Sequence, residues 1–403
     1  MSKTSFQIGV ATVDITPPLG VLLAGYGPRK GTASEVGHPL RAEALVCRGD
    51  DGRAWALLTS DVIGYPYEMV QRIRREVAAQ VPLKPEAILI SGTHTHSGPS
   101  ALSTYNEKLG DADHAYRREF EPKIVKVLVD AFKAARPGSF EVAWTKAPDL
   151  AHNRRVIDDS LGTCENVWLD EQGEHSGYFD PTVMVLAVRR EDDRRDAMLV
   201  NYGCHPVTLG PRSLAISSDY PGYLKDALES ERPGLTVMFA LAGGGNINPR
   251  HCIQVGAEHP KQMGEALAGI VRGAVAKLKP LPGGPVVSSR QPWSFTSCRE
   301  WPEASPRKKG RRLETEIQAL RAGDLAVVSL PGELFSQYAA MLRKTSPVSA
   351  TVVVSLANDS TGYLPVDEAL PQGGHEVVHR SAAEGIEQSL MATAGKAFAG
   401  IAK

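Results

Sequence analysis

Apolar runs of strand length alternate along the chain with longer segments in which apolar residues recur every three or four positions. The short runs are typical of buried strands and the longer spacing of helices that bury one face. Their alternation predicts an α/β fold, with layered mixed β-sheets flanked by helices. We expect strands near 42–48, 54–61, 139–145, 183–189, 197–203, 235–241, 325–330 and 350–357, and helices near 66–80, 114–135, 221–230, 260–278 and 333–344.

Two segments carry further expectations about solvent exposure. In the helix predicted over 66–80, the apolar positions Met69, Ile73 and Val77 face the core, and the remaining face presents arginines to solvent (Arg72, Arg74 and Arg75). The segment 298–312 is rich in Pro, Lys and Arg and is predicted to be an exposed loop.

Two histidines, His94 and His96, stand two positions apart just after the apolar run 87–90. In an extended segment, alternate side chains point to the same side, so we expect both imidazoles on one face where the strand ends. Imidazole is the commonest metal ligand in proteins. The pair therefore predicts a metal site.

Other polar residues also follow predicted strands: His205 after 197–203, Glu333 after 325–330, and the segment 358–363 after 350–357. Ligands bind at the carboxyl ends of strands in α/β sheets, so we expect the site there. Taken singly, His205 fits a hydrogen-bonded core histidine and Glu333 an acid in the first turn of a helix. With His94 they form a nitrogen and oxygen ligand set suited to a catalytic zinc ion.

The loop 241–249 is rich in glycine but lacks both the Gly-Lys-Ser/Thr ending of a phosphate loop and the Gly-x-Gly-x-x-Gly spacing of a dinucleotide fold. We expect Gly244, Gly245 and Asn246 to bind substrate, by close approach of the backbone or by N–H donation to a developing oxyanion. A tight turn that requires glycine explains the same residues equally well.

Charge and composition limit the kinds of partner and substrate that we expect for this protein. The chain has 45 Lys and Arg against 46 Asp and Glu, so charge gives no reason to expect nucleic acid. The start of the chain lacks a secretory apolar region and no run approaches the roughly 20 apolar residues of a membrane span, which predicts a cytoplasmic protein without an integral membrane segment. Five widely spaced cysteines indicate neither disulfides nor a thiolate zinc site. We expect a small-molecule substrate.

Several segments together resemble the zinc-dependent N-terminal catalytic domain of the neutral ceramidase family. They stand in the family's order and span nearly the whole chain, and the run Thr-His-Thr-His-Ser-Gly-Pro at 93–99 is the most specific of them. The segments are 13–17, 25–27, 40–42, 93–99, 153–154, 205–208, 218–222, 245–249 and 331–333.

The resemblance implies one zinc ion per chain, held by His94, His205, Glu333 and Tyr363. It also places His96 and Arg154 in the substrate site. Where the family has a further tyrosine, this chain has His375, which makes His375 a candidate donor to the reacting carbonyl.

Besides the histidine at 375, two departures from the family and a low aromatic content bear on the expected substrate. The chain is shorter, so we expect a single catalytic domain over 1–403 without the family's C-terminal immunoglobulin-like domain. The family's Gly-Asp-x-Ser-Pro loop reads Gly-Asn-Ile-Asn-Pro at 245–249, without a serine, and only 6% of residues are aromatic. These features favour a substrate smaller or more polar than ceramide.

The sequence thus predicts a zinc-dependent amide hydrolase that uses water as nucleophile. His96 or His375 would pass a proton to the leaving amine, and Arg154 would orient a polar or anionic part of the substrate. Alternatives are an esterase or lactonase at the same zinc, a two-metal site that recruits Asp61, His96 or Asp219, and a noncatalytic metal-supported binding protein. Asp61 and Asp219 also fit turn or helix-capping residues.

Overall fold

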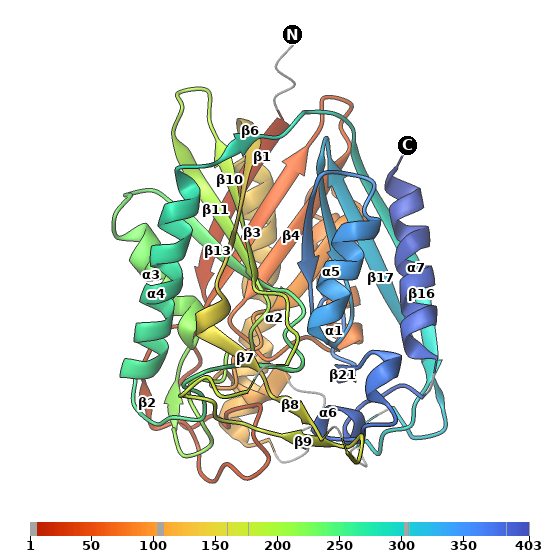
Figure 1. Cartoon of the computed structure of the whole chain (residues 1–403). Helices are drawn as coiled ribbons and strands as arrows, with labels where there is room; N and C mark the ends of the chain where they lie inside the picture. The colour runs from red at the N-terminus through yellow and green to blue at the C-terminus, as the bar shows by residue number, and fades with distance from the viewer. Residues whose placement is uncertain are drawn as a thin grey trace.

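The computed structural model describes residues 6–102, 109–158, 160–175, 177–301, 305, 307–383 and 385–402. It confirms the α/β fold: two mixed sheets lie beside each other with helices on their outer faces (Figure 1). None of the helices in these ranges is both long and apolar enough to cross a membrane.

The larger sheet contains nine strands. Its parallel pairs are β4 with β5 and β11 with β13, and its other pairs are antiparallel. The strand order is β13 (Thr236–Leu241), β11 (Arg195–Tyr202), β10 (Thr182–Arg189), β6 (Arg136–Lys146), β1 (Phe6–Asp14), β3 (Arg41–Arg48), β4 (Ala54–Ser60) and β5 (Ile88–Gly92), with β15 (Lys279–Pro280) also on β6.

The smaller sheet has the order β16 (Val286–Thr296), β17 (Arg312–Ala322), β18 (Leu325–Ser329) and β20 (Ala350–Val354). Strands of both sheets contribute to one apolar core. Asn201 of β11 joins the sheets, because its side chain donates to the carbonyl of Val353 at 2.8 Å and accepts from the Val353 N–H at 3.3 Å. These two hydrogen bonds tie β11 of the larger sheet to β20 of the smaller one.

The helices pack by their apolar faces. In α1 (Tyr67–Ala78) the predicted inner residues Met69, Ile73 and Val77 are buried. Helices α3 (Tyr220–Glu229) and α4 (Glu258–Val275) share a core with β11 and β13, whereas α5 (Ser336–Thr345) and α7 (Ile386–Ile401) cover the smaller sheet. The remaining helices are α2 (Asp111–Lys133) and the short α6 (His375–Val378).

Short strands and turns connect these layers at the end of the molecule where α6, β8 and β9 gather in Figure 1. The two-stranded pairs are β2 (Glu35–Val36) with β12 (Ala215–Ile216), β7 (Ala151–Asn153) with β14 (Ile247–Pro249), β8 (Arg155–Ile157) with β9 (Cys164–Asn166), and β19 (Glu333–Leu334) with β21 (Tyr363–Leu364). Single 3₁₀ turns cover Pro85–Ala87, Ser100–Leu102, Pro148–Leu150 and Asp367–Ala369.

One prediction about exposure is wrong, and another holds for most of its segment. Arg74 is fully buried and pairs with Glu316 of β17 at 2.7 Å. The arginine tolerates burial because the Glu316 carboxylate neutralises its charge inside the protein. The segment 298–312 is a connection between β16 and β17 that is largely exposed, as predicted, with Glu300 and residues 308–312 open to solvent, although Trp301 and Arg307 are buried. Arg307 stacks on the Trp301 ring and pairs with Asp359 at 2.6 Å, which fastens this loop to the body of the protein.

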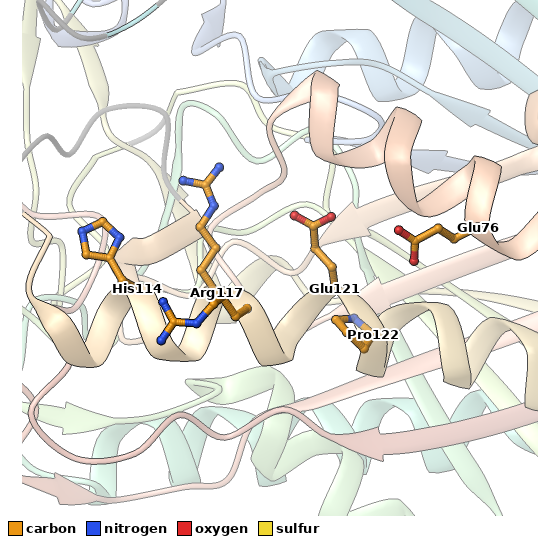
Figure 2. A pocket seen from close by; sticks show the side chains of 6 residues that line it. Glu76, His114, Arg117, Glu121 and Pro122 are labelled. Atoms are coloured by element: carbon orange, nitrogen blue, oxygen red, sulfur yellow. The ribbon is translucent and has the colours of Figure 1, made fainter.

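A surface pocket of about 480 Å³ lies between α1 and α2 (Figure 2). Its walls are the charged outer faces of these helices, with Glu76, His114, Arg117 and Glu121 among them. The ion pair between Arg72 and Glu121, at 2.6 Å, joins the two helices there. This surface pocket includes none of the residues at the strand ends that the sequence singles out.

Candidate metal centre

The predicted ligands come from strand ends of both sheets. His94 follows β5, His205 follows β11, and Glu333 follows β18 as the first residue of β19. The parallel pairing of β19 with β21 sets Glu333 directly opposite Tyr363. The fold therefore brings these four residues to one place at the carboxyl ends of strands, as the sequence predicts.

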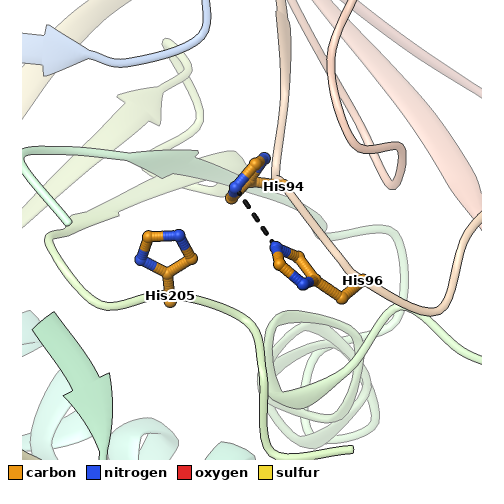
Figure 3. A group of neighbouring side chains, drawn as sticks. All are labelled: His94, His96 and His205. Carbon is orange, nitrogen blue, oxygen red and sulfur yellow. Dashed lines mark hydrogen bonds between the residues drawn. The ribbon is translucent and has the colours of Figure 1, made fainter. Parts of the chain in front are cut away.

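His94 and His96 meet, but not through strand alternation. Strand β5 ends at Gly92, and His94 has a φ of 72°, so the segment turns instead of staying extended. The Nε2 atoms of the two rings lie 3.3 Å apart, and the rings are nearly perpendicular at 85° (Figure 3). The left-handed residue at 94 is what aims both imidazoles at one point.

Four donor groups converge on this point. One ring nitrogen each from His94, His96 and His205 lies within 4.8 Å of the others. The Oε2 atom of Glu333 lies 3.2 Å from Nε2 of His205 and 3.4 Å from Nε2 of His94. All four side chains are largely buried, and such a cluster of nitrogen and carboxylate donors fits a transition-metal ion such as zinc.

Hydrogen bonds on the far side of the rings fix the tautomers of two histidines. Nδ1 of His94 donates to the carbonyl of Ile63 at 2.7 Å, and Nδ1 of His205 donates to that of Gly244 at 2.5 Å. With the proton on Nδ1, each Nε2 presents a lone pair to the cluster. Metal-binding histidines are oriented in this way by outer partners.

His96 differs from the other two histidines. Its Nδ1 atom is buried without a hydrogen-bond partner, and its ring packs edge-on against Tyr26 at 4.9 Å. No carbonyl therefore fixes its tautomer, and the ring is able to carry a proton on either nitrogen. That contrast matches the separate role predicted for His96, which stays a prediction.

The electrostatics of the cluster favour a neutral His205 imidazole beside an ionised Glu333 carboxylate. Burial lowers the pKa of His205 to about 4. Burial also acts to raise the pKa of Glu333, but His94 and His205 hold it well below the usual range. Unprotonated nitrogen and ionised oxygen are the forms that bind a metal.

Arg154 is buried behind Tyr363 and not among the residues that line the pocket described below. Its guanidinium donates to Tyr363 Oη at 3.1 Å, Gly245 O at 2.8 Å, Asn248 Oδ1 at 2.9 Å and Glu376 Oε1 at 2.6 Å. Burial, reinforced by Glu333, raises the pKa of the Tyr363 hydroxyl, and the Arg154 charge opposes that rise. Arg154 thus orients the tyrosine hydroxyl.

Glu376 is a residue that sequence reasoning missed. Its carboxylate is completely buried, pairs with Arg154 and with Arg155 at 2.9 Å, and accepts two bonds from Asn166. Burial opposes ionisation, but the Arg154 charge and hydrogen bond lower the pKa of Glu376 to about 2. Its position directly after the candidate His375 is the only sequence signal that marks it.

His375 begins α6 and lines the same pocket as the cluster. Its ring lies 5.5 Å from that of Tyr363, 5.1 Å from that of Trp168 and 4.4 Å from that of His379. Burial, followed by the Arg154 charge, lowers the pKa of His375 to about 4. A neutral ring at this place is able to donate one N–H to a ligand in the pocket.

The glycine-rich loop supports the cluster from behind. The carbonyl of Gly244 accepts from His205, that of Gly245 accepts from Arg154, and Gly245 N–H donates to Leu334 O at 2.6 Å. Asn246 accepts from the backbone N–H of Ser336. None of Gly244, Gly245 and Asn246 is among the described residues that line the pocket. Their predicted contact with substrate is still untested.

Three further residues that the sequence raises as candidates, Asp61, Asp219 and Cys204, have structural surroundings. Asp61 pairs with Lys225 at 2.7 Å, and Asp219 accepts from the N–H of Tyr220 at the start of α3 and from Thr208. These are the contacts of an ion-paired residue and of a helix cap. Burial raises the pKa of the Cys204 thiol well above its usual value, as expected of an ordinary core cysteine.

A pocket of about 940 Å³ opens onto the cluster. Its floor includes His94, His96, Glu333 and Tyr363, and one wall is the loop 22–31. The other described residues that line it are Ile63, Ser100, Leu102, Arg299, Ser360, His375 and His379. A small molecule that enters the pocket therefore meets the cluster directly.

Fold and site together define a layered α/β protein with a buried histidine and carboxylate centre at the base of a pocket. The chain belongs to the neutral/alkaline non-lysosomal ceramidase family, whose N-terminal domain model matches residues 6–251. This finding confirms the resemblance seen in the sequence.

Two curated relatives come from Dictyostelium discoideum. Neutral ceramidase A is 25% identical over 256 residues, which covers 60% of this chain and 35% of that protein. Neutral ceramidase B is 23% identical over 261 residues, which covers 61% and 36%. The matches thus span about a third of the length of these relatives.

The fold matches solved structures over nearly the whole chain. The crystal structure of neutral ceramidase from Pseudomonas aeruginosa aligns with a TM-score of 0.79 and 15% identity, covering 98% of this chain and 74% of that one. A structure described as ceramidase complexed with C2 gives a TM-score of 0.80 at the same identity and covers 75% of its chain. These likenesses establish the fold.

Proposed function

We propose that this protein is a metal-dependent hydrolase that cleaves an amide bond with water. The observation that carries the proposal is the convergence of His94, His205 and Glu333 at the base of a pocket, with the two histidine tautomers fixed so that their lone pairs face inward. Membership of the ceramidase family favours an amide as the bond cleaved.

His94, His205, Glu333 and Tyr363 would hold one zinc ion. The donor set fits the metal, since the Nε2 atoms of His94 and His205 face the Glu333 carboxylate at 3.4 and 3.2 Å. A bound zinc ion lowers the pKa of a coordinated water toward neutrality and polarises a carbonyl group. These four residues are the set that the family resemblance implies.

The chain's own residues would supply proton transfer and positioning. His96 lies beside the cluster with one unpartnered ring nitrogen and is our candidate for carrying a proton to the leaving amine. His375 faces the pocket and would donate to the substrate carbonyl. Arg154 positions Tyr363 by the hydrogen bond to its hydroxyl, and the loop carbonyls of Gly244 and Gly245 position His205 and Arg154 in turn.

The pocket favours a substrate smaller or more polar than ceramide. Its described lining includes seven ionisable groups besides Tyr26 and Tyr363, namely Arg29, Arg299, Glu333, His94, His96, His375 and His379. An esterase or lactonase activity at the same centre is the second candidate, because an activated water attacks either kind of acyl group.

Matched N-acyl amides and acyl esters of increasing chain length test the proposal on the zinc-loaded protein. We expect amide hydrolysis that a chelator abolishes and added zinc restores. Faster turnover of every ester than of its matched amide would favour the second candidate. Undiminished amide hydrolysis by metal-free protein would overturn the metal-dependent mechanism.

A further inference from the structure

Arg29 is a half-buried cation in the wall of the pocket, next to the histidine cluster. Its Nη1 atom donates to the carbonyls of Ala24 and His96, both at 2.7 Å, and its Nη2 atom donates a long bond of 3.4 Å to Gly210 O. The guanidinium also lies 5.0 Å from the centre of the Tyr26 ring. Within the described part of the chain, it forms no ion pair with a carboxylate.

Other buried arginines of this fold do have a carboxylate partner. The pairs are Arg74 with Glu316, Arg154 and Arg155 with Glu376, Arg190 with Asp196, Arg307 with Asp359 and Arg343 with Asp180. Burial of a charge without such a partner is costly. Burial accordingly lowers the pKa of Arg29 to about 10, so it still carries its charge at neutral pH.

The rest of the pocket does not neutralise this charge. Among the described residues that line it, Glu333 alone is acidic, and its carboxylate is already directed at His94 and His205. Arg299 adds a second guanidinium to the lining. Apolar side chains also line the pocket, namely Leu22, Leu23, Ile63 and Leu102. The pocket thus combines a cationic wall with an apolar one.

We propose that Arg29 binds a carboxylate of the substrate and that the substrates are N-acyl amino acids. Guanidinium groups bind carboxylates through charge-assisted hydrogen bonds. Because Arg29 is bonded to the backbone of His96, it places the carboxylate beside the amide that the cluster attacks, as the α-carboxylate of an N-acyl amino acid requires. The apolar wall receives the acyl chain.

This inference rests on the proposed function and names its substrate class. Hydrolysis breaks the C–N bond of the amide, the oxygen of water joins the acyl carbon, and both protons of the water pass to the nitrogen, which leaves as an ammonium group. The products are a fatty carboxylate and a free amino acid.

The test compares N-octanoylglycine with N-octanoylethanolamine, which has the same acyl group and amide but ends in a hydroxyl. We expect kcat/KM to favour the glycine compound by about tenfold or more in the wild-type protein, the contribution of one charge-assisted contact. Arg29→Gln should bring the ratio of the two values to about one, and Arg29→Lys should retain part of the preference. Arg53→Gln, at an exposed arginine, should leave the ratio unchanged.

The two proposals fail in different ways. Hydrolysis of both compounds with no preference for the carboxylate in the wild-type protein overturns the role of Arg29 and leaves the amide hydrolase standing. If neither compound is cleaved, equilibrium binding by calorimetry decides: tighter binding of N-octanoylglycine that Arg29→Gln removes supports the subsite, and equal binding of the two compounds overturns it.

Discussion

Nε of Arg154 lies 2.6 Å from Oε1 of Glu376, and the two side chains are almost completely buried. The same guanidinium bonds the Tyr363 hydroxyl, so a carboxylate outside the pocket lining fixes a candidate metal ligand through one intermediate side chain. This chain of contacts links α6 to the centre.

Glu376→Gln should lower the free energy of unfolding at pH 7 by about 3 kcal/mol, the effect of removing one partner from a buried ion pair. The folded-state pKa of Glu376 is lowered to about 2. Its ionisation therefore stabilises the protein fully above the unfolded-state value near 4.5 and progressively less as the pH falls toward 2. Denaturant unfolding of wild type and variant from pH 7 to pH 2 checks this.

The difference in unfolding free energy between the two proteins should shrink across that acid range. A difference that stays constant down to pH 2 would contradict the role assigned to Glu376. Glu165→Gln, which removes the carboxylate of an exposed residue on neighbouring β9, is the matched control.

Gly25→Ala should displace His96. Gly25 has a φ of 90°, and a Cβ atom added there would lie 2.3 Å from Cγ of His96. Gly20 supplies a matched control, since its φ is 91° and an added Cβ meets nothing within 4 Å. Both alanine variants carry similar backbone strain, of order 1 kcal/mol or more. Thermal unfolding and amide turnover together separate strain from displacement.

We expect similar losses of stability in the two glycine variants, and at least a tenfold lower kcat in Gly25→Ala alone. Equal kcat values would show that the loop 22–31 does not position His96.

His96→Asn should keep the metal and lose turnover. Removal of a proton-transferring side chain typically lowers the rate by 10² to 10⁴. Metal content measured beside kcat distinguishes this role from that of a ligand, and His251→Asn, at an exposed histidine, is the control. If His96→Asn binds no metal, His96 belongs to the ligand set instead.

The sequence predicts where the candidate ligands gather because apolar runs locate strand ends, and the carboxyl ends of strands gather the functional side chains of such folds. His205 and Glu333 are examples. The geometry at His94 was not predictable in the same way, since its left-handed backbone depends on surrounding contacts such as the bond from its N–H to Val62 O at 3.0 Å.

Buried polar residues account for much of what the sequence hides. Strand β17 escapes detection because Glu316 and Gln318 occupy buried positions and interrupt the apolar pattern, with Arg74 as their partner from α1. Helix α7 is composed largely of alanine, glycine and short polar residues, so its buried stripe is weakly marked. Glu376 has no local signal beyond its place after His375, because its partners are about 210 to 222 positions away.

Metal analysis of the purified protein and its variants tests the central claim most directly. After zinc loading and removal of free metal, the wild-type chain should contain one equivalent of zinc by mass spectrometry. His94→Ala, His205→Ala and Glu333→Ala should each lose it while remaining folded by circular dichroism, and His96→Asn should retain it. Wild-type protein that binds no zinc, or His94→Ala and His205→Ala variants that bind a full equivalent, would contradict the account.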